Sequence, residues 1–348
     1  MFWIVGGRDV LLTFSNVFAD PPPPWLQYQL SHPAWLGFTA WDMIMPLFLF
    51  IVGTAMPFSF SNRLEQGHTK ANLYTKIIRR TLLLFIMGMV VQGHLLDFDL
   101  SKLSLYCNTL QAIAAGYLIA GLLILNVGLL AQIAATAGLL LGYWALLISV
   151  PIAGHEVGVL QPDANLALSV DQFLLGQFRA ENNYTWILSS MGFAATVLLG
   201  VLSGHLLRSK LSPWQRVLAL IAIGFACLAG GWIWDHWLGF PIIKHIWTSS
   251  MVLWAGGWSF LLLALFYLLI DVLNYRRWAF PFVVIGMNAI TIYMANRFIP
   301  FDDIAETLVG GLASHLGIVG PALIALTTMS LVWFMLYHMY RHKIFLRL

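Results

Sequence analysis

Charged residues are scarce in this sequence. Asp, Glu, Lys and Arg make up 9% of its 348 residues, whereas hydrophobic residues make up 60%. A soluble domain is about a quarter charged, so the composition excludes an ordinary soluble protein and indicates an integral membrane protein. The formal net charge is +3 at pH 7, and the basic residues are scattered rather than gathered in a stripe. We therefore expect no nucleic-acid partner.

Cysteine is scarcer still. Only Cys107 and Cys227 are present, and they lack the spacing of metal ligands, so no metal is expected. Cys227 falls inside an apolar run and Cys107 near a loop, so we expect no disulfide between them. The N-terminus also lacks the basic region and the full apolar core of a cleavable signal peptide.

Long apolar runs, by contrast, fill nearly the whole chain. A membrane helix needs ~20 mostly apolar residues to cross a ~30 Å hydrocarbon core. The candidate spans are Trp41–Phe60, Ile77–Gly93, Thr109–Leu125, Val127–Val150, Tyr184–Leu207, Val217–Trp234, Trp247–Ile270, Phe280–Arg297 and Gly317–Tyr340. Length alone would allow two domains, but these runs predict an all-α polytopic membrane protein that forms a single domain over residues 1–348.

The chain opens with a shorter apolar run, MFWIVGG, which breaks at Gly6-Gly7-Arg8-Asp9. Seven helical residues rise ~10 Å, about a third of a bilayer. We interpret this run as the end of a span whose beginning is missing. The expected bundle therefore has about ten transmembrane helices, the first of them truncated, and a fuller native chain would extend upstream of Met1.

The basic residues are distributed unevenly between alternate connections. If the connection after Trp41–Phe60 is cytoplasmic, thirteen of the 18 Lys and Arg residues fall on that side. Cytoplasmic loops carry an excess of Lys and Arg. The asymmetry thus predicts that the loop containing His32 lies outside the cytoplasm, together with the connection Pro151–Asn183.

Two titratable residues lie where the first complete span begins, in QLSHPAWLGFTAWDMIMPLFLFIVG. His32 lies in a polar, aromatic loop, and histidine is the usual general base near neutral pH; a surface or packing role is the alternative. Asp42 either complements the helix dipole or has a partner and a function, because ionisable groups near a membrane are costly. Trp35 is either an interfacial anchor or a substrate contact.

Polar groups also gather in KHIWTSSMVLWAGGWS, which runs from Lys244 to Ser259. This stretch brings a cation, hydroxyls and glycines to one external helix end, and its small residues also permit close helix packing. On the cytoplasmic side, TKIIRRTLLL carries Arg79 and Arg80. These arginines either set the topology or bind an anion.

A third polar stretch, GMNAITIYMANRF, lies inside the span Phe280–Arg297. Asn288 and Thr291 are three residues apart and hence share a helix face. Such a face either holds helices together or lines a polar cavity. Polar groups at external span ends, with basic residues inside, fit a transporter as well as an enzyme.

These stretches together resemble the heparan-α-glucosaminide N-acetyltransferase family of transmembrane acyltransferases, particularly its bacterial members. SHPAWLGFTAWDMIMPLFLFIVGTAMPFS is similar to the family's His-x-x-Trp-x-Gly…Asp-Leu-x-x-Pro-x-Phe-x-Phe-x-x-Gly signature. NTLQAIAAGYLIA, KHIWTSSMVL, GMNAITIY and RHKIFLRL follow in matching order and spacing. Three departures stand out: Ala112 replaces an arginine, Asn296 replaces a histidine, and Met1 falls inside the family's first catalytic-domain helix.

The resemblance implies transfer of an acetyl group from cytoplasmic acetyl-CoA to an amino sugar or other glycan outside a bacterial inner (cytoplasmic) membrane, by N- or O-acetylation. The family's luminal histidine falls on His32, which would be the general base, with Asp42 in a supporting role. Asn288, Ser249 or backbone N–H groups would stabilise the oxyanion. The rival hypothesis is a transporter or flippase of a small glycan or anion.

The remaining candidate site residues follow from the same resemblance. The lipid bilayer, acetyl-CoA and the glycan acceptor are the expected partners, and family analogy favours a homodimer. Contacts with acetyl-CoA are assigned to Arg79, Arg80, Ser249 and Ser250, and contacts with the acceptor to Trp35, Lys244, Asn296 and Arg297.

The predicted topology can be tested with cysteines introduced at Gln27 and Ser209. An impermeant thiol reagent applied to intact cells should label the Gln27→Cys protein and leave the Ser209→Cys protein unlabelled, because the basic asymmetry puts residue 27 outside and residue 209 inside. Labelling at Ser209 with protection at Gln27 would reverse the topology.

Overall fold

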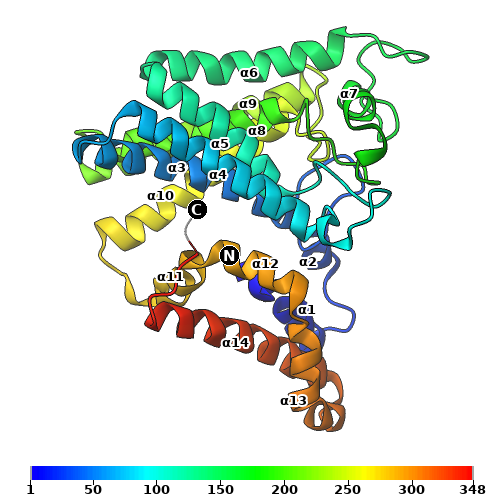
Figure 1. The fold of residues 1–348 in the computed structure, drawn as a ribbon. Helices are drawn as coiled ribbons and strands as arrows, with labels where there is room; N and C mark the ends of the chain where they lie inside the picture. Colours follow the sequence, from blue (N-terminus) through cyan, green and yellow to red (C-terminus); the bar gives the residue numbers. More distant parts are fainter. Residues whose placement is uncertain (1, 347–348) are drawn as a thin grey trace. The chain divides into compact units, whose positions relative to one another are not determined.

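Figure 1 shows the computed structural model, which describes residues 2–346. Within that range the chain forms helices and three isolated β-bridges, and no strand. The all-α prediction is therefore confirmed. The chain divides into two compact units, Met1–His32 with Thr39–Ile44 and Leu269–Leu348, and Pro33–Phe38 with Met45–Leu268. That residues 1–348 form one domain stays a prediction.

The second unit contains most of the long apolar helices. They are α3 (Ile44–Glu65, of which the unit holds Met45 onward), α4 (Lys70–Val91), α5 (Thr109–Asn126), α6 (Leu129–Ser149), α8 (Ser190–Leu207), α9 (Pro213–His236) and α10 (Ser249–Tyr267). The unit also contains the short helix α7 (Leu166–Leu175). Helix α8 packs against α5, α6 and α10. It is the most buried of the candidate spans, with 67% of its apolar window inside the protein, so it forms the core of this unit.

Helices α3 and α8 approach each other until their backbones touch. A Cβ atom built on Gly53 would lie 1.9 Å from the Val197 carbonyl oxygen, and one built on Gly200 would lie 2.0 Å from the Phe50 carbonyl oxygen. Membrane helices lack a hydrophobic driving force for association, so small residues that permit close packing take its place.

The first unit contains several shorter helices and one long one. They are α1 (Gly7–Phe18), α2 (Pro24–Gln29), the 3-10 turn η2 (Ala40–Met43), α11 (Phe280–Met287), α12 (Ala289–Phe298), α13 (Phe301–His315) and α14 (Gly320–Arg341). Helix α14 packs against α1, α11 and α13. The core of the first unit is aliphatic and includes Val284, Ile292, Val332 and Leu336.

Among residues 2–346, seven helices are long and apolar enough to cross a membrane, and the bent pair α11–α12 would make eight. The expected total of about ten spans is therefore not confirmed. The predicted span Ile77–Gly93 corresponds to α4, which has 22 residues but carries four basic residues, Lys70, Lys76, Arg79 and Arg80. The predicted span Phe280–Arg297 is bent by 61° at Asn288.

Two stretches outside the predicted spans are helical. The predicted break after MFWIVGG is present at Gly6, whose φ is +98°, but the chain then continues as α1. Apolar residues recur at helical spacing in GRDVLLTFSNVF, and this periodicity explains the helix. Similarly, residues 300–315 lie between two predicted spans but form α13 (Phe301–His315), which pairs with α14.

Connections that the charge pattern assigns to one side contact each other within the second unit. At one end, Arg208 after α8 lies 3.8 Å from Glu65 at the end of α3. At the other end, the Leu105 amide donates to the Phe178 carbonyl, and the Thr185 amide donates to the His245 carbonyl, both at 3.0 Å. Which membrane face each end occupies stays a prediction.

The α3–α8 contact predicts opposite effects for two glycine substitutions. Gly200→Ala should lower thermal stability in detergent, because its Cβ would overlap the Phe50 carbonyl and overpacking costs about 1–3 kcal/mol. Gly138→Ala in α6 should leave stability unchanged or raise it slightly, since no atom lies within 4 Å of its added Cβ and alanine favours helix. Equal melting temperatures for the two variants would contradict the close contact.

Candidate active site

A histidine and a buried carboxylate face each other in the first unit. His32 Nδ1 lies 2.6 Å from Asp42 Oδ1. The Asp42 side chain is 1% exposed, whereas that of His32 is 44% exposed. The other oxygen, Asp42 Oδ2, accepts the Thr39 amide N–H at 3.0 Å. Both oxygens of the Asp42 carboxylate thus have a hydrogen-bond partner, and the carboxylate fixes the Nδ1 edge of the His32 ring.

The local fold explains why these two residues meet. Thr39 and Asp42 form a capping box at the start of η2, the pattern in which two residues three apart satisfy each other's backbone donors. Thr39 Oγ1 lies 2.7 Å from Ser31 O and 3.1 Å from Asp42 Oδ2, so its single proton serves one of them at a time. The contact between Thr39 and Ser31 places His32, the next residue, beside this capping box.

An aromatic and cationic layer supports the same loop. The Trp41 ring lies 6.3 Å from the His32 ring between centroids, and the Arg8 guanidinium lies 5.3 Å from the Trp41 centroid. Arg8 Nε also donates to Leu30 O at 2.8 Å. Helix α1 therefore holds both the loop that carries His32 and the tryptophan beside it.

This geometry suits proton transfer. If His32 Nδ1–H donates to Asp42, the neutral ring carries its lone pair on Nε2. A carboxylate that holds an imidazole in one tautomer and stabilises the imidazolium is the arrangement found in Ser-His-Asp hydrolases. Two of the three catalytic residues of the sequence prediction, His32 and Asp42, are thus brought together, and their role as base and orienting group stays a prediction.

The other candidates in the first unit lie elsewhere along its helices. Asn288 is 1% exposed and occupies the bend between α11 and α12. Its Nδ2 donates to Ile344 O at 3.1 Å, and its Oδ1 accepts the Leu346 amide at 3.4 Å. The side chain thus fastens the C-terminal segment, and its role toward an oxyanion stays a prediction. Asn296 and Arg297 are exposed in the last turn of α12.

The candidate serines have structural contacts in the second unit. Ser249 Oγ donates to Leu140 O at 2.7 Å, and Ser250 Oγ donates to Pro241 O at 2.9 Å. Both residues are 0% exposed. Ser249 thus ties the start of α10 to α6, and Ser250 holds the turn before α10, while a role of either serine in acetyl-CoA binding stays a prediction.

Trp35 and Lys244 also lie in the second unit. The Trp35 indole N–H donates to Leu160 O at 2.8 Å, and its ring stacks on His245 with 5.1 Å between centroids. Lys244 is 7% exposed, with Nζ 5.9 Å from the Tyr184 ring centroid. Trp35 therefore ties two connections together, while the burial of Lys244 sets it apart from a solvated surface lysine.

The two arginines of α4 differ clearly. Arg79 is exposed, whereas Arg80 is partly buried, with its guanidinium 4.6 Å from the Tyr117 ring centroid. Arg80 Nε is buried and has no hydrogen-bond partner among residues 2–346. Because a buried, incompletely paired arginine in a membrane helix usually has a functional partner, Arg80 is the stronger candidate for an anion contact.

The NTLQ segment is a helix cap. Asn108 caps α5 and forms a capping box with Gln111, and Gln111 Nε2 donates to Leu105 O at 2.6 Å. Ala112, where the family resemblance expects arginine, is 0% exposed. The described residues contain no group of three or more His, Cys, Asp or Glu side chains suited to a metal ion.

Sequence reasoning missed three residues of these clusters. Arg8 is part of a predicted helix break, Tyr117 lies among the apolar residues of its span, and His245 follows Lys244 in a stretch that contains a cation and several hydroxyls. Only His245 carried a usable signal, because it is a titratable residue directly after Lys244 in a polar stretch. The contacts of Arg8 and Tyr117 depend on how helices pack.

Long apolar helices and a scarcity of charge define the class as a multi-pass, all-helical membrane protein. Comparison with known proteins adds a distant relationship to heparan-alpha-glucosaminide N-acetyltransferase. The chain is 24% identical to the Mus musculus protein in an alignment of 342 residues that covers 79% of this chain and 51% of the relative. It is also 24% identical to the Homo sapiens protein over 348 residues, covering 79% and 50% of the two chains.

The chain thus spans about half the length of the curated relatives it matches. No protein-family model matches it.

Proposed function

We propose that this protein is a transmembrane acetyltransferase that moves an acetyl group from acetyl-CoA to an amino sugar or other glycan acceptor. The observation that carries the proposal is the His32–Asp42 pair, in which a buried carboxylate orients a half-exposed imidazole. The distant relationship to named N-acetyltransferases supports the reaction class. The basic asymmetry supports an acceptor outside the cytoplasmic membrane and a donor inside.

In the proposed reaction, His32 Nε2 accepts a proton from the acceptor as its amine nitrogen or hydroxyl oxygen attacks the thioester carbonyl of acetyl-CoA. The new C–N or C–O bond forms while the C–S bond breaks. The CoA thiolate leaves and takes the proton from the imidazolium, so the base is regenerated. Asp42 holds the ring in the accepting tautomer and stabilises its protonated form.

Donor recognition is proposed for Arg80. CoA carries phosphates, and the planar fork of arginine suits phosphate oxygens. Arg80 lies ten residues into α4, about 15 Å along its axis, and its Nε has no hydrogen-bond partner among residues 2–346. The alternative, a transporter or flippase, would give no hydrolysis of acyl-CoA and no acetylated product.

His32→Ala should keep the fold and acetyl-CoA binding but lower the acetyl-transfer rate by ~10²–10⁴-fold, which is the usual contribution of general-base catalysis. The matched control is His94→Ala. His94 also pairs with a carboxylate, Asp97, at 3.0 Å, but both side chains are more than 40% exposed. Turnover and melting temperature measured on one preparation separate catalysis from packing. Near-parental turnover by a folded His32→Ala protein would remove the proposal.

Asp42→Asn tests the orienting role separately. With its amide oxygen on the Thr39 N–H, the new NH₂ group would donate to His32 Nδ1 and force the tautomer whose Nε2 carries a proton. The kcat should therefore fall, whereas the acetyl-CoA Kd should stay near that of the parent. A fall in melting temperature with unchanged kcat would show that Asp42 acts only in packing.

Arg80→Gln should weaken acetyl-CoA binding about 10-fold or more, because a hydrogen bond to a charged group contributes about 1.5–3 kcal/mol. Arg79→Gln is the matched control and should bind acetyl-CoA like the parent, since Arg79 is exposed. Binding is measured by titration of the purified protein, and its stability without ligand is measured alongside. Equal affinity in both variants would restrict these arginines to setting the topology.

A further inference from the structure

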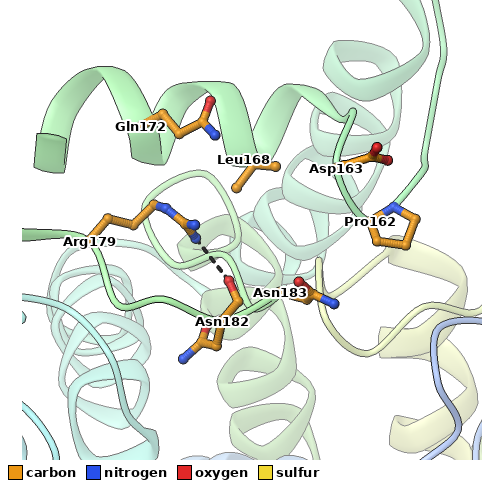
Figure 2. Close-up of a pocket in the computed structure, with 7 residues that line it drawn as sticks. All are labelled: Pro162, Asp163, Leu168, Gln172, Arg179, Asn182 and Asn183. Atoms are coloured by element: carbon orange, nitrogen blue, oxygen red, sulfur yellow. Dashed lines mark hydrogen bonds between the residues drawn. The ribbon is translucent and has the colours of Figure 1, made fainter. Parts of the chain in front are cut away.

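A polar pocket lies in the second unit between α7 and the segment that leads into α8 (Figure 2). Its volume is ≈ 250 Å³, the share of about eight water molecules in the liquid. Asp163, Gln172 and Asn183 contribute exposed polar side chains, and Leu168 contributes a buried apolar one. The pocket is therefore large enough for a single small ring and offers it both polar and apolar contacts.

The walls of this pocket are fixed by hydrogen bonds. Asn165, which is 0% exposed, caps α7 by accepting the Leu168 amide at 2.8 Å and donates to Gln161 O at 2.9 Å. On the opposite wall, Arg179 donates to Asn182 O at 2.9 Å, as the dashed line in Figure 2 marks. Fixed walls reduce the entropy lost when a ligand binds.

The buried carboxylate of Asp171, a residue of α7, connects the two walls of the pocket. Asp171 accepts the amides of Trp186 and Ile187 at 2.7 and 2.9 Å. Burial raises the pKa of the Asp171 carboxyl to about 6, against the opposing effect of these two amide donors and Arg179. Asp171 thus anchors the segment that follows Asn183 to the helix that carries Gln172.

The lining defines the ligand by its chemistry. The side-chain amides of Gln172 and Asn183 each offer donors and an acceptor. Asp163 and Arg179 add one charge of each sign, so their formal charges cancel. Pro162 and Leu168 supply apolar contact. Hydroxyl groups that both donate and accept, attached to a ring with an apolar face, match this set, whereas a free anion would meet the Asp163 carboxylate.

We propose that this pocket binds one saccharide ring through the amides of Gln172 and Asn183. Binding requires neither His32 nor acetyl-CoA, so it stands apart from the proposed acetyl transfer. The pocket is also held in place by a residue of the signature stretch, because the Trp35 indole N–H donates to the carbonyl of Leu160, two residues before Pro162.

The test is a titration of the full chain in detergent with N-acetylglucosamine, glucosamine and glucose, followed by ligand-observed NMR. Saturable binding is expected, and Gln172→Ala and Asn183→Ala should each weaken it about 3- to 10-fold, the loss expected for one hydrogen bond. The matched controls are Gln177→Ala and Glu181→Gln, which are exposed nearby but do not line the pocket. They should bind like the parent.

Two further measurements make the result decisive. Asp163→Asn should weaken glucosamine more than glucose, because only the amino sugar carries a cation for the carboxylate. Inorganic phosphate is titrated as the competing ligand class.

Three outcomes would each overturn the assignment. The first is no sugar binding by the folded protein, and the second is equal affinities in the pocket and control variants. The third is saturable phosphate binding that is lost in Arg179→Gln, without any sugar binding. If the His32→Ala protein loses acetyl transfer but still binds sugar, the saccharide-binding proposal is supported.

Discussion

The Asp42 carboxylate is 1% exposed at the start of an apolar span, and a charge so placed is tolerated only when its oxygens have donors. The Thr39 amide serves one oxygen and the His32 ring serves the other. Satisfying this carboxylate therefore requires the loop before the span to fold back onto the helix start. The candidate base is oriented as a consequence of that requirement.

Several internal polar side chains make hydrogen bonds that hold the fold together. Ser249 ties α10 to α6, Ser250 holds the turn before α10, Asn288 fastens the C-terminal segment at a helix bend, and Gln111 completes a helix cap. In a membrane, backbone groups that a bend or helix end leaves open must be satisfied within the protein. Such side chains are indistinguishable in sequence from ligand-binding ones, because both are isolated polar residues in apolar runs.

Apolar periodicity and length predicted the existence of most long helices, while the count and the interruptions were harder to predict. The bend at Asn288 divides a run whose composition reads as continuous, and α13 was missed because Asp302, Asp303 and Glu306 give its beginning a loop-like polarity. Close packing of α3 on α8 leaves only glycines as a signal in sequence. Which glycines face each other is decided by helix rotation, which a single sequence does not specify.

The candidate site was predicted unevenly for a related reason. His32 and Asp42 are ten residues apart, and their meeting follows from a local capping box whose residues the sequence contains. Arg80 could not be separated from Arg79 in sequence, because successive helical residues point about 100° apart and either could face inward. Only the packing of α5 decides the matter, by placing Tyr117 beneath Arg80. Local chemistry was thus readable in the sequence, whereas the choice between adjacent residues depended on tertiary contact.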